Sequence, residues 1–259
     1  MNIHKIIHLF LLFLAGILIS CQQVIDLKLN TSSSQIVIQG NIYDLTVPDT
    51  VHISQSVNFD STNVFPAVSG AIVTINDNIG NTDSLKEIFP GTYITSFIKG
   101  IPGNTYTLQV EIKGKRYSAT STMPYPVAID SVYFEKSIIE NDKQIAVEFT
   151  DPANIENFYR IIEFVNQGQL DNFFVTSDQL NDGGKIIYRI WNDNQRLTSG
   201  KNITIWLESI DENMYNYFRA AASNGRQIIA PANPVSNISN GALGYFSACS
   251  IRNKRIVVP

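Results

Sequence analysis

The sequence predicts a mainly β protein with two antiparallel β-sandwich-like domains and one α-helix in the second domain. Charged residues make up only 16% of the 259 residues, while Asn, Ser, Thr, Tyr and Ile are abundant. This mix favours β structure, because β-branched and aromatic side chains fit a pleated, half-buried surface. Short runs of alternating apolar and polar residues recur along the chain, and turn residues separate them, as in a β-sandwich.

Residues 1–20 have the three parts of an export signal: a basic residue, a long apolar run and a small residue before the expected cut. The sequence Leu18-Ile19-Ser20-Cys21 resembles a bacterial lipobox, so we expect cleavage before Cys21 and lipidation of that cysteine. Two or three acyl chains anchor a protein stably, whereas one chain is marginal. The alternative is an ordinary secretory signal, which would leave Cys21 unmodified.

The rest of the chain divides into a stalk and two predicted domains. Residues 21–34 are polar and rich in Ser and Thr, which predicts a flexible lipidated stalk. The N-terminal β-sandwich domain is expected over residues 35–122, and a C-terminal β-rich domain over residues 123–259. The boundary is placed at Pro124 and Pro126, because two prolines in three positions remove backbone donors and force an extended backbone.

The clearest strand of the N-terminal domain covers residues 105–112, where Tyr106, Leu108 and Val110 alternate with polar residues. The pair Lys113-Gly114 predicts a hairpin turn into a second strand. Further strands of this domain are expected to begin near residues 36, 71 and 91.

The C-terminal domain is expected to hold several strands and the helix. Residues 202–210 alternate as in a strand, with Ile203, Ile205 and Leu207 on one face. Residues 211–223 then change to helical spacing. Asp211 is suited to cap the first turn of this helix, and the Gly after residue 224 is suited to end it.

Charge and histidine content exclude several classes of function. Without the signal, 18 basic residues stand against 23 acidic ones, a net charge of −5, which argues against binding of nucleic acid. His52 is the one histidine after the signal, so a His-rich zinc site is excluded and any Ser-His-Asp triad must use it. The sequence therefore predicts no catalytic residue, no metal site and no cofactor beyond the covalent lipid on Cys21.

One less favoured function stays open, and one cysteine remains to be placed. A hydrolase would have to use acidic residues such as Asp151, Glu156 or Glu163, whose spacing supports no known arrangement. Cys249 has no partner for a disulfide if Cys21 is lipidated, and its strand-like surroundings predict a buried, unreactive thiol.

Tyr188, Trp191 and Trp206 are the candidate contacts to a ligand or partner. Trp206 lies on the face of its strand opposite to Ile205 and Leu207, which would leave the ring exposed. Exposed aromatic side chains bury a large area in a contact. The alternative is that the helix or the second sheet covers this face, so that Trp206 belongs to the core.

Several short segments, in this order along the chain, resemble the DUF4249 lipoproteins of Bacteroidota, a family of uncharacterised function. They are Cys21 with residues 24–26, and residues 36–42, 68–73, 91–93, 103–108, 121–124, 233–238 and 241–246. The first half also resembles carboxypeptidase-regulatory or transthyretin-like sandwiches, and the two domains together are expected to be immunoglobulin-like or transthyretin-like.

The resemblance implies an outer-membrane lipoprotein, because members of that family are often encoded beside TonB-dependent receptors. The function expected from it is a non-enzymatic accessory or ligand-binding role in a TonB-dependent uptake system. The membrane would be reached through the lipid anchor, on either the surface or the periplasmic face. The alternative is a structural or adhesive cell-surface lipoprotein, in which the sandwiches act as spacers.

Overall fold

The computed structural model describes residues 33–58, 64–136, 143–170, 173–190, 197–224 and 234–259. The predicted signal, Cys21 and nearly all of the stalk lie outside these residues. Ser34–Pro259 form one unit. Within the described ranges, no helix has the length and apolar character needed to cross a membrane.

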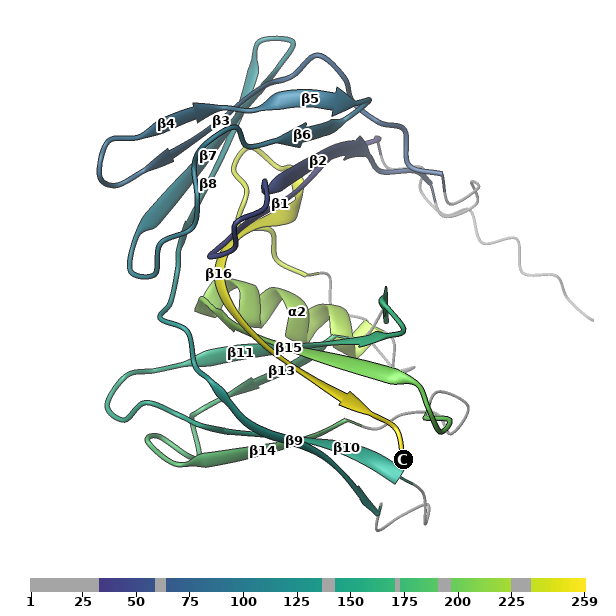
Figure 1. Cartoon of the computed structure of the whole chain (residues 1–259). Helices are drawn as coiled ribbons and strands as arrows, with labels where there is room; N and C mark the ends of the chain where they lie inside the picture. The colour runs from purple at the N-terminus through teal and green to yellow at the C-terminus, as the bar shows by residue number, and fades with distance from the viewer. Residues whose placement is uncertain (1–32, 59–63, 137–142, 171–172, 191–196, 225–233) are drawn as a thin grey trace, which may run out of the picture. The chain divides into compact units, whose positions relative to one another are not determined.

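The alternating segments of the first half form eight strands (Figure 1). They are β1 (Ile36–Tyr43), β2 (Thr50–Gln55), β3 (Ile72–Asp77), β4 (Thr82–Ser84), β5 (Lys86–Phe89), β6 (Thr92–Ile94), β7 (Thr105–Ile112) and β8 (Lys115–Thr122). On β7 the residues predicted to face one way, Tyr106, Leu108 and Val110, are all buried.

The second half adds eight strands and one helix to the described part of the chain. They are β9 (Ile129–Lys136), β10 (Lys143–Thr150), β11 (Phe158–Val165), β12 (Gly168–Gln169), β13 (Phe174–Ser177), β14 (Lys185–Ile190), β15 (Asn202–Ile210), α2 (Glu212–Asn224) and β16 (Leu243–Val257). Asp211 caps α2 as predicted, because its carboxylate accepts from the backbone N–H of Met214 at 2.9 Å.

The strands form three sheets. A nine-stranded sheet has the order β12-β11-β15-β16-β1-β2-β6-β5, with β13 also paired to β11. A four-stranded sheet has the order β4-β3-β7-β8, and a three-stranded sheet the order β14-β10-β9. The pair β1–β16 is parallel, and the other pairings of the described strands are antiparallel. The predicted fold class, mainly β in antiparallel sheets with one helix, is confirmed.

The long strand β16 belongs to both halves of the protein. Its residues 243–249 pair with β1, and its residues 250–257 pair with β15. Phe246 and Ala248 lie in the core of the first half, together with Ile238 and Ala242 from the segment before the strand. The C-terminal segment therefore completes the N-terminal sandwich before it enters the C-terminal one.

A buried ion pair lies beneath α2, where β11 and β15 run side by side. The Arg160 guanidinium donates to the Glu208 carboxylate at 3.2 Å, and it stacks 4.0 Å from the Phe218 ring centroid. Both charged side chains are almost fully buried. Burial raises the pKa of Glu208, and the positive charge of Arg160 opposes that rise.

Asp49 forms hydrogen bonds to two segments at one end of the first sandwich, the end of β1 and the residue after β6. Its carboxylate accepts from the Tyr43 N–H at 3.0 Å, and its own N–H donates to the Thr95 hydroxyl at 2.9 Å. Burial raises the pKa of Asp49 to about 7, although the hydrogen bond from Tyr43 opposes the rise.

The pairing of β1 with β16 predicts a large effect of Gly244→Ala. A Cβ at Gly244 would lie 2.0 Å from the Ile38 carbonyl oxygen, and φ there is +95°. We expect the free energy of unfolding to fall by about 3 kcal/mol or more in a urea titration. Gly241→Ala is the matched control, because Gly241 has φ +73° but open space around it, and it should cost only about 1–2 kcal/mol. Equal losses in both variants would contradict the close pairing.

The raised pKa of Asp49 predicts that the stability of the protein depends on pH. Its pKa is about 7 in the folded chain and about 3.9 in an unfolded one, so the folded state holds the proton more tightly. The free energy of unfolding should therefore fall as pH rises from about 4 to about 7, by up to about 4 kcal/mol. In Asp49→Asn, which keeps an acceptor for the Tyr43 N–H, this fall should disappear. Denaturant titrations across the range would refute the prediction if both proteins showed the same slope.

Candidate functional site

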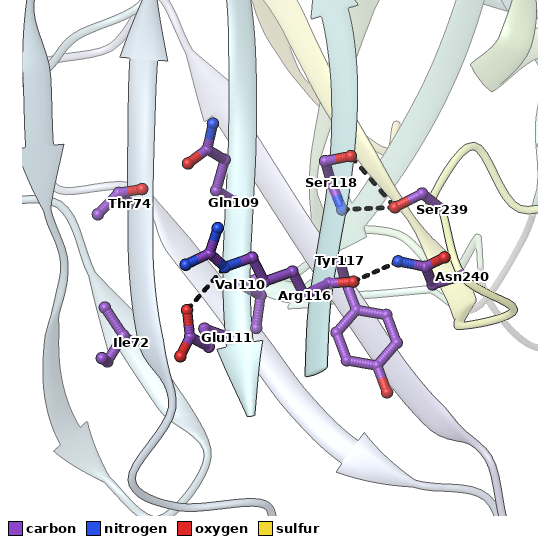
Figure 2. Close-up of a pocket in the computed structure, with 10 residues that line it drawn as sticks. All are labelled: Ile72, Thr74, Gln109, Val110, Glu111, Arg116, Tyr117, Ser118, Ser239 and Asn240. Carbon is purple, nitrogen blue, oxygen red and sulfur yellow. Dashed lines mark hydrogen bonds and ion pairs between the residues drawn. The ribbon is translucent and has the colours of Figure 1, made fainter. Parts of the chain in front are cut away.

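A groove of about 460 Å³ lies on the four-stranded sheet (Figure 2). We call it the groove. Its lining residues are Ile72, Thr74, Gln109, Val110, Glu111, Arg116, Tyr117, Ser118, Ser239 and Asn240. A groove of this size is typical of small-ligand sites.

Strand alternation sets the floor of the groove. Thr74 on β3, Gln109 on β7 and Ser118 on β8 turn to the outer face, while their neighbours along each strand are buried in the first core. Because the three strands pair in register, the outward side chains lie side by side. The result is a polar floor on a rigid sheet.

The far wall of the groove comes from the segment just before β16. The Ser239 N–H donates to the Ser118 carbonyl at 2.8 Å, and the Ser118 N–H donates to the Ser239 hydroxyl at 2.8 Å. The Asn240 amide donates to the Arg116 carbonyl at 2.6 Å. These bonds cover the free edge of β8, so the wall is held in place before any ligand binds.

Arg116 and Glu111 supply the charges of the groove. Their side chains form an ion pair at 3.0 Å, and the Arg116 side chain is 84% exposed. An exposed ion pair of this kind contributes only about 0–1 kcal/mol to stability. Arg116 can therefore leave Glu111 and bind a ligand carboxylate or phosphate instead. With the hydroxyls and amides around it, the groove suits a polar ligand that has an acidic group.

A second exposed surface lies at the end of the first sandwich where the β1–β2, β6–β7 and β8–β9 loops meet. It carries Val47, Phe97, Ile101 and Tyr125, which are 50–72% exposed. We call it the loop-end patch. Hydrogen bonds fasten the loops to each other, such as Gly100 N–H to the Tyr43 carbonyl and Gly103 N–H to the Met123 carbonyl. Clustered exposed apolar side chains on fixed loops are typical of a contact with another protein.

Of the three aromatic residues predicted as contacts, the structure describes Tyr188 and Trp206, which lie on strands of different sheets. Tyr188 is half-buried on β14 and packs against the second core, with its ring 6.0 Å from that of Phe174. Trp206 is half-buried on the opposite face of β15 from the core residues, and its ring lies 4.8 Å from that of Phe164. Trp191 and Cys21 lie outside the described residues. The roles of these four residues stay predictions.

Three carboxylates approach each other in the second half. Asp151, Asp178 and Asp182 each place an oxygen within 4.8 Å of the others, so together they could hold a metal ion. Asp151 accepts from the Tyr159 hydroxyl and the Gly183 N–H, and the other two accept from backbone N–H groups of residues 157 and 154. Burial raises the pKa of Tyr159, and Asp151 raises it further. These bonds fasten the loops that flank β10 and β14.

Sequence reasoning missed the groove. The alternation of β7 and β8 indicated which side chains face outward, but nothing local indicated that Ser239 would pack on Ser118, 121 residues away. Cys249, in contrast, is a free and buried thiol, as predicted.

Two solved structures resemble the chain distantly. A two-domain fibronectin type III segment of chicken tenascin is 12% identical, with 87% of this chain and 99% of that chain covered and a TM-score of 0.25. The adhesin InvE of Yersinia pseudotuberculosis is 15% identical, with 67% and 55% covered and a TM-score of 0.23. At these scores the likenesses carry no argument about function.

Among curated proteins, no sequence matches the chain significantly. The family model described as "Domain of unknown function (DUF4249)" matches residues 22–255. That match spans nearly the whole chain after Cys21, and it agrees with the resemblance seen in the short sequence segments. The chain therefore belongs to the DUF4249 family.

Proposed function

We propose that this protein is a lipid-anchored, non-enzymatic binding protein of the outer membrane, which holds a polar ligand for a TonB-dependent receptor. The groove carries the proposal, because it is a preformed site on a rigid sheet with one exchangeable cation, Arg116. The lipobox at Cys21 supplies the anchor, and the family resemblance supplies the link to a receptor.

The ligand class follows from the side chains of the groove. Arg116 favours a carboxylate or phosphate, while Gln109, Ser118 and Asn240 offer amides and hydroxyls. An acidic oligosaccharide or a short peptide with a free carboxylate fits this set. Both expose one negative group and several polar groups along an extended chain.

The loop-end patch gives the receptor a place to bind. It lies on the loops between strands, whereas the groove lies on the face of the four-stranded sheet, so that the ligand and the receptor would occupy different surfaces. A receptor contact of this kind buries aromatic anchors such as Phe97 and Tyr125.

A structural or adhesive lipoprotein is the second candidate function. One observation favours it: β16 runs without interruption from the first sandwich into the second, so the two halves are joined by a paired strand and not only by a linker. A stiff connection suits a spacer. The two candidates differ in that a spacer needs neither the groove nor the loop-end patch.

Arg116→Ala is expected to weaken ligand binding by about tenfold or more, because hydrogen bonds to charged groups contribute about 1.5–3 kcal/mol. The measurement is calorimetric titration of the mature protein with sets of acidic oligosaccharides and short peptides. Arg255→Ala is the matched control, since Arg255 is also exposed but lies on β16 outside the groove. If no set member binds, or if both variants bind equally, the groove is not the ligand site.

The receptor contact is tested by chemical cross-linking in native membranes. Phe97→Ser with Tyr125→Ser should abolish recovery of a TonB-dependent receptor with this protein, because two aromatic anchors are lost. Leu180→Ser is the control, since Leu180 is 92% exposed on the second half. Failure to recover any receptor with the unaltered protein would favour the structural or adhesive function.

A further inference from the structure

A second group of exposed apolar side chains lies at the end of the first sandwich opposite to the loop-end patch. Val64 and Phe65 are 72% and 56% exposed on the segment after β2, and Ile88 and Phe89 are 42% and 69% exposed at the end of β5. We call these four residues the apolar tip. The prolines that follow Phe65 and Phe89 are exposed as well.

The two segments of the apolar tip lie against each other. A Cβ at Gly91, two residues after Phe89, would come within 3.2 Å of the Ala67 Cβ and 2.4 Å of the Ile53 carbonyl oxygen. The Ile53 N–H donates to the Gly91 carbonyl at 2.8 Å, and the Gln55 N–H donates to the Pro66 carbonyl at 2.9 Å. Both segments are therefore attached to the last residues of β2.

Glu87 fixes the turn that carries Phe89. Its carboxylate accepts from the Gly70 N–H at 3.0 Å and from the Gly91 N–H at 2.9 Å, and these bonds hold the pKa of Glu87 below its usual range. The ionised side chain thus joins both segments of the tip from below. Because the tip is fixed in advance, little conformational entropy is lost when it makes a contact.

The described chain begins at this same end of the sandwich. The Ser34 hydroxyl donates to the Ser56 carbonyl at 2.7 Å, and the Gln35 N–H donates to the Ser56 hydroxyl at 2.9 Å. In Figure 1 the start of β1 lies beside the ends of β2 and β5. From Cys21 to Ser34 there are only 13 residues, which span at most about 47 Å when fully extended.

We propose that the apolar tip rests in the headgroup region of the bilayer to which the chain is anchored. This inference rests on the lipid anchor of the proposed function and adds a second, non-covalent membrane contact. Four apolar side chains bind a bilayer only weakly by themselves. A short tether from the same end of the sandwich keeps them at high local concentration, so the weak contact becomes persistent. The loop-end patch, at the opposite end, then faces away from the lipid.

Site-specific fluorescence of the lipidated protein tests the proposal. Phe89→Cys is labelled with an environment-sensitive dye and reconstituted into vesicles of phosphatidylethanolamine and phosphatidylglycerol. Labelling is confined to the new thiol, because Cys249 is buried and Cys21 carries the lipid. Ile79→Cys is the matched control, since Ile79 is 64% exposed in the turn beside the first residue of β7, at the loop end.

We expect blue-shifted emission and quenching by spin-labelled lipid at position 89, and neither at position 79. The same response at both positions, or at neither, would overturn the proposal. The proposal would also be overturned if the emission at position 89 shifted to the blue when a receptor is added in the absence of lipid. The tip would then be a contact with a protein.

Two further measurements separate the tip from the anchor. An intact mass without lipid on Cys21 would refute the anchor of the proposed function. The mature, unlipidated protein would then still test the tip by sedimentation with the same vesicles. There, Phe65→Ser with Phe89→Ser should lower binding about tenfold or more, with the far-ultraviolet circular dichroism unchanged. Equal binding of this double variant and the parent would overturn the proposal.

Discussion

Strand β16 pairs with β1 of the first half and with β15 of the second, so its backbone hydrogen bonds hold both sandwiches together. One half of the strand completes the N-terminal sandwich through its parallel ladder with β1, and the other half pairs with β15. The ladder with β1 requires a glycine at position 244, where a side chain would collide with the Ile38 carbonyl. Because β1 and β16 are about 200 residues apart in the sequence, the first sandwich stays incomplete until residues 243–249 are in place.

The passage of β16 from the first half into the second, which we call the crossing, also positions the groove. The segment that leads into β16 covers the edge of β8 and forms the wall of the groove through Ser239 and Asn240. Beneath α2, the buried pair of Arg160 and Glu208 lies close to the crossing. A buried pair of this kind adds little net stability, but loss of one partner is costly, so it favours one arrangement of helix and strands.

Much of the secondary structure could be predicted, because alternation is a local signal. Tyr106, Leu108 and Val110 on β7, and Ile203, Ile205 and Leu207 on β15, are buried as the pattern indicated. The predicted turn at Lys113-Gly114 joins the paired strands β7 and β8, and Asp211 caps the helix. What could not be predicted is long-range. The neighbouring sequence indicates neither the parallel partner of β1 nor the contact of Ser239 with Ser118.

Because β16 pairs with a strand of each half, it should join the two halves into a single cooperative unit. Native-state hydrogen exchange of the backbone amides in β1, β15 and β16 measures this cooperativity. If β16 is shared, the protected amides of β1 and β15 should exchange through the same opening, with one common free energy and one common dependence on denaturant. Exchange of β1 through a separate opening of much lower free energy, while β15 stays protected, would contradict the account.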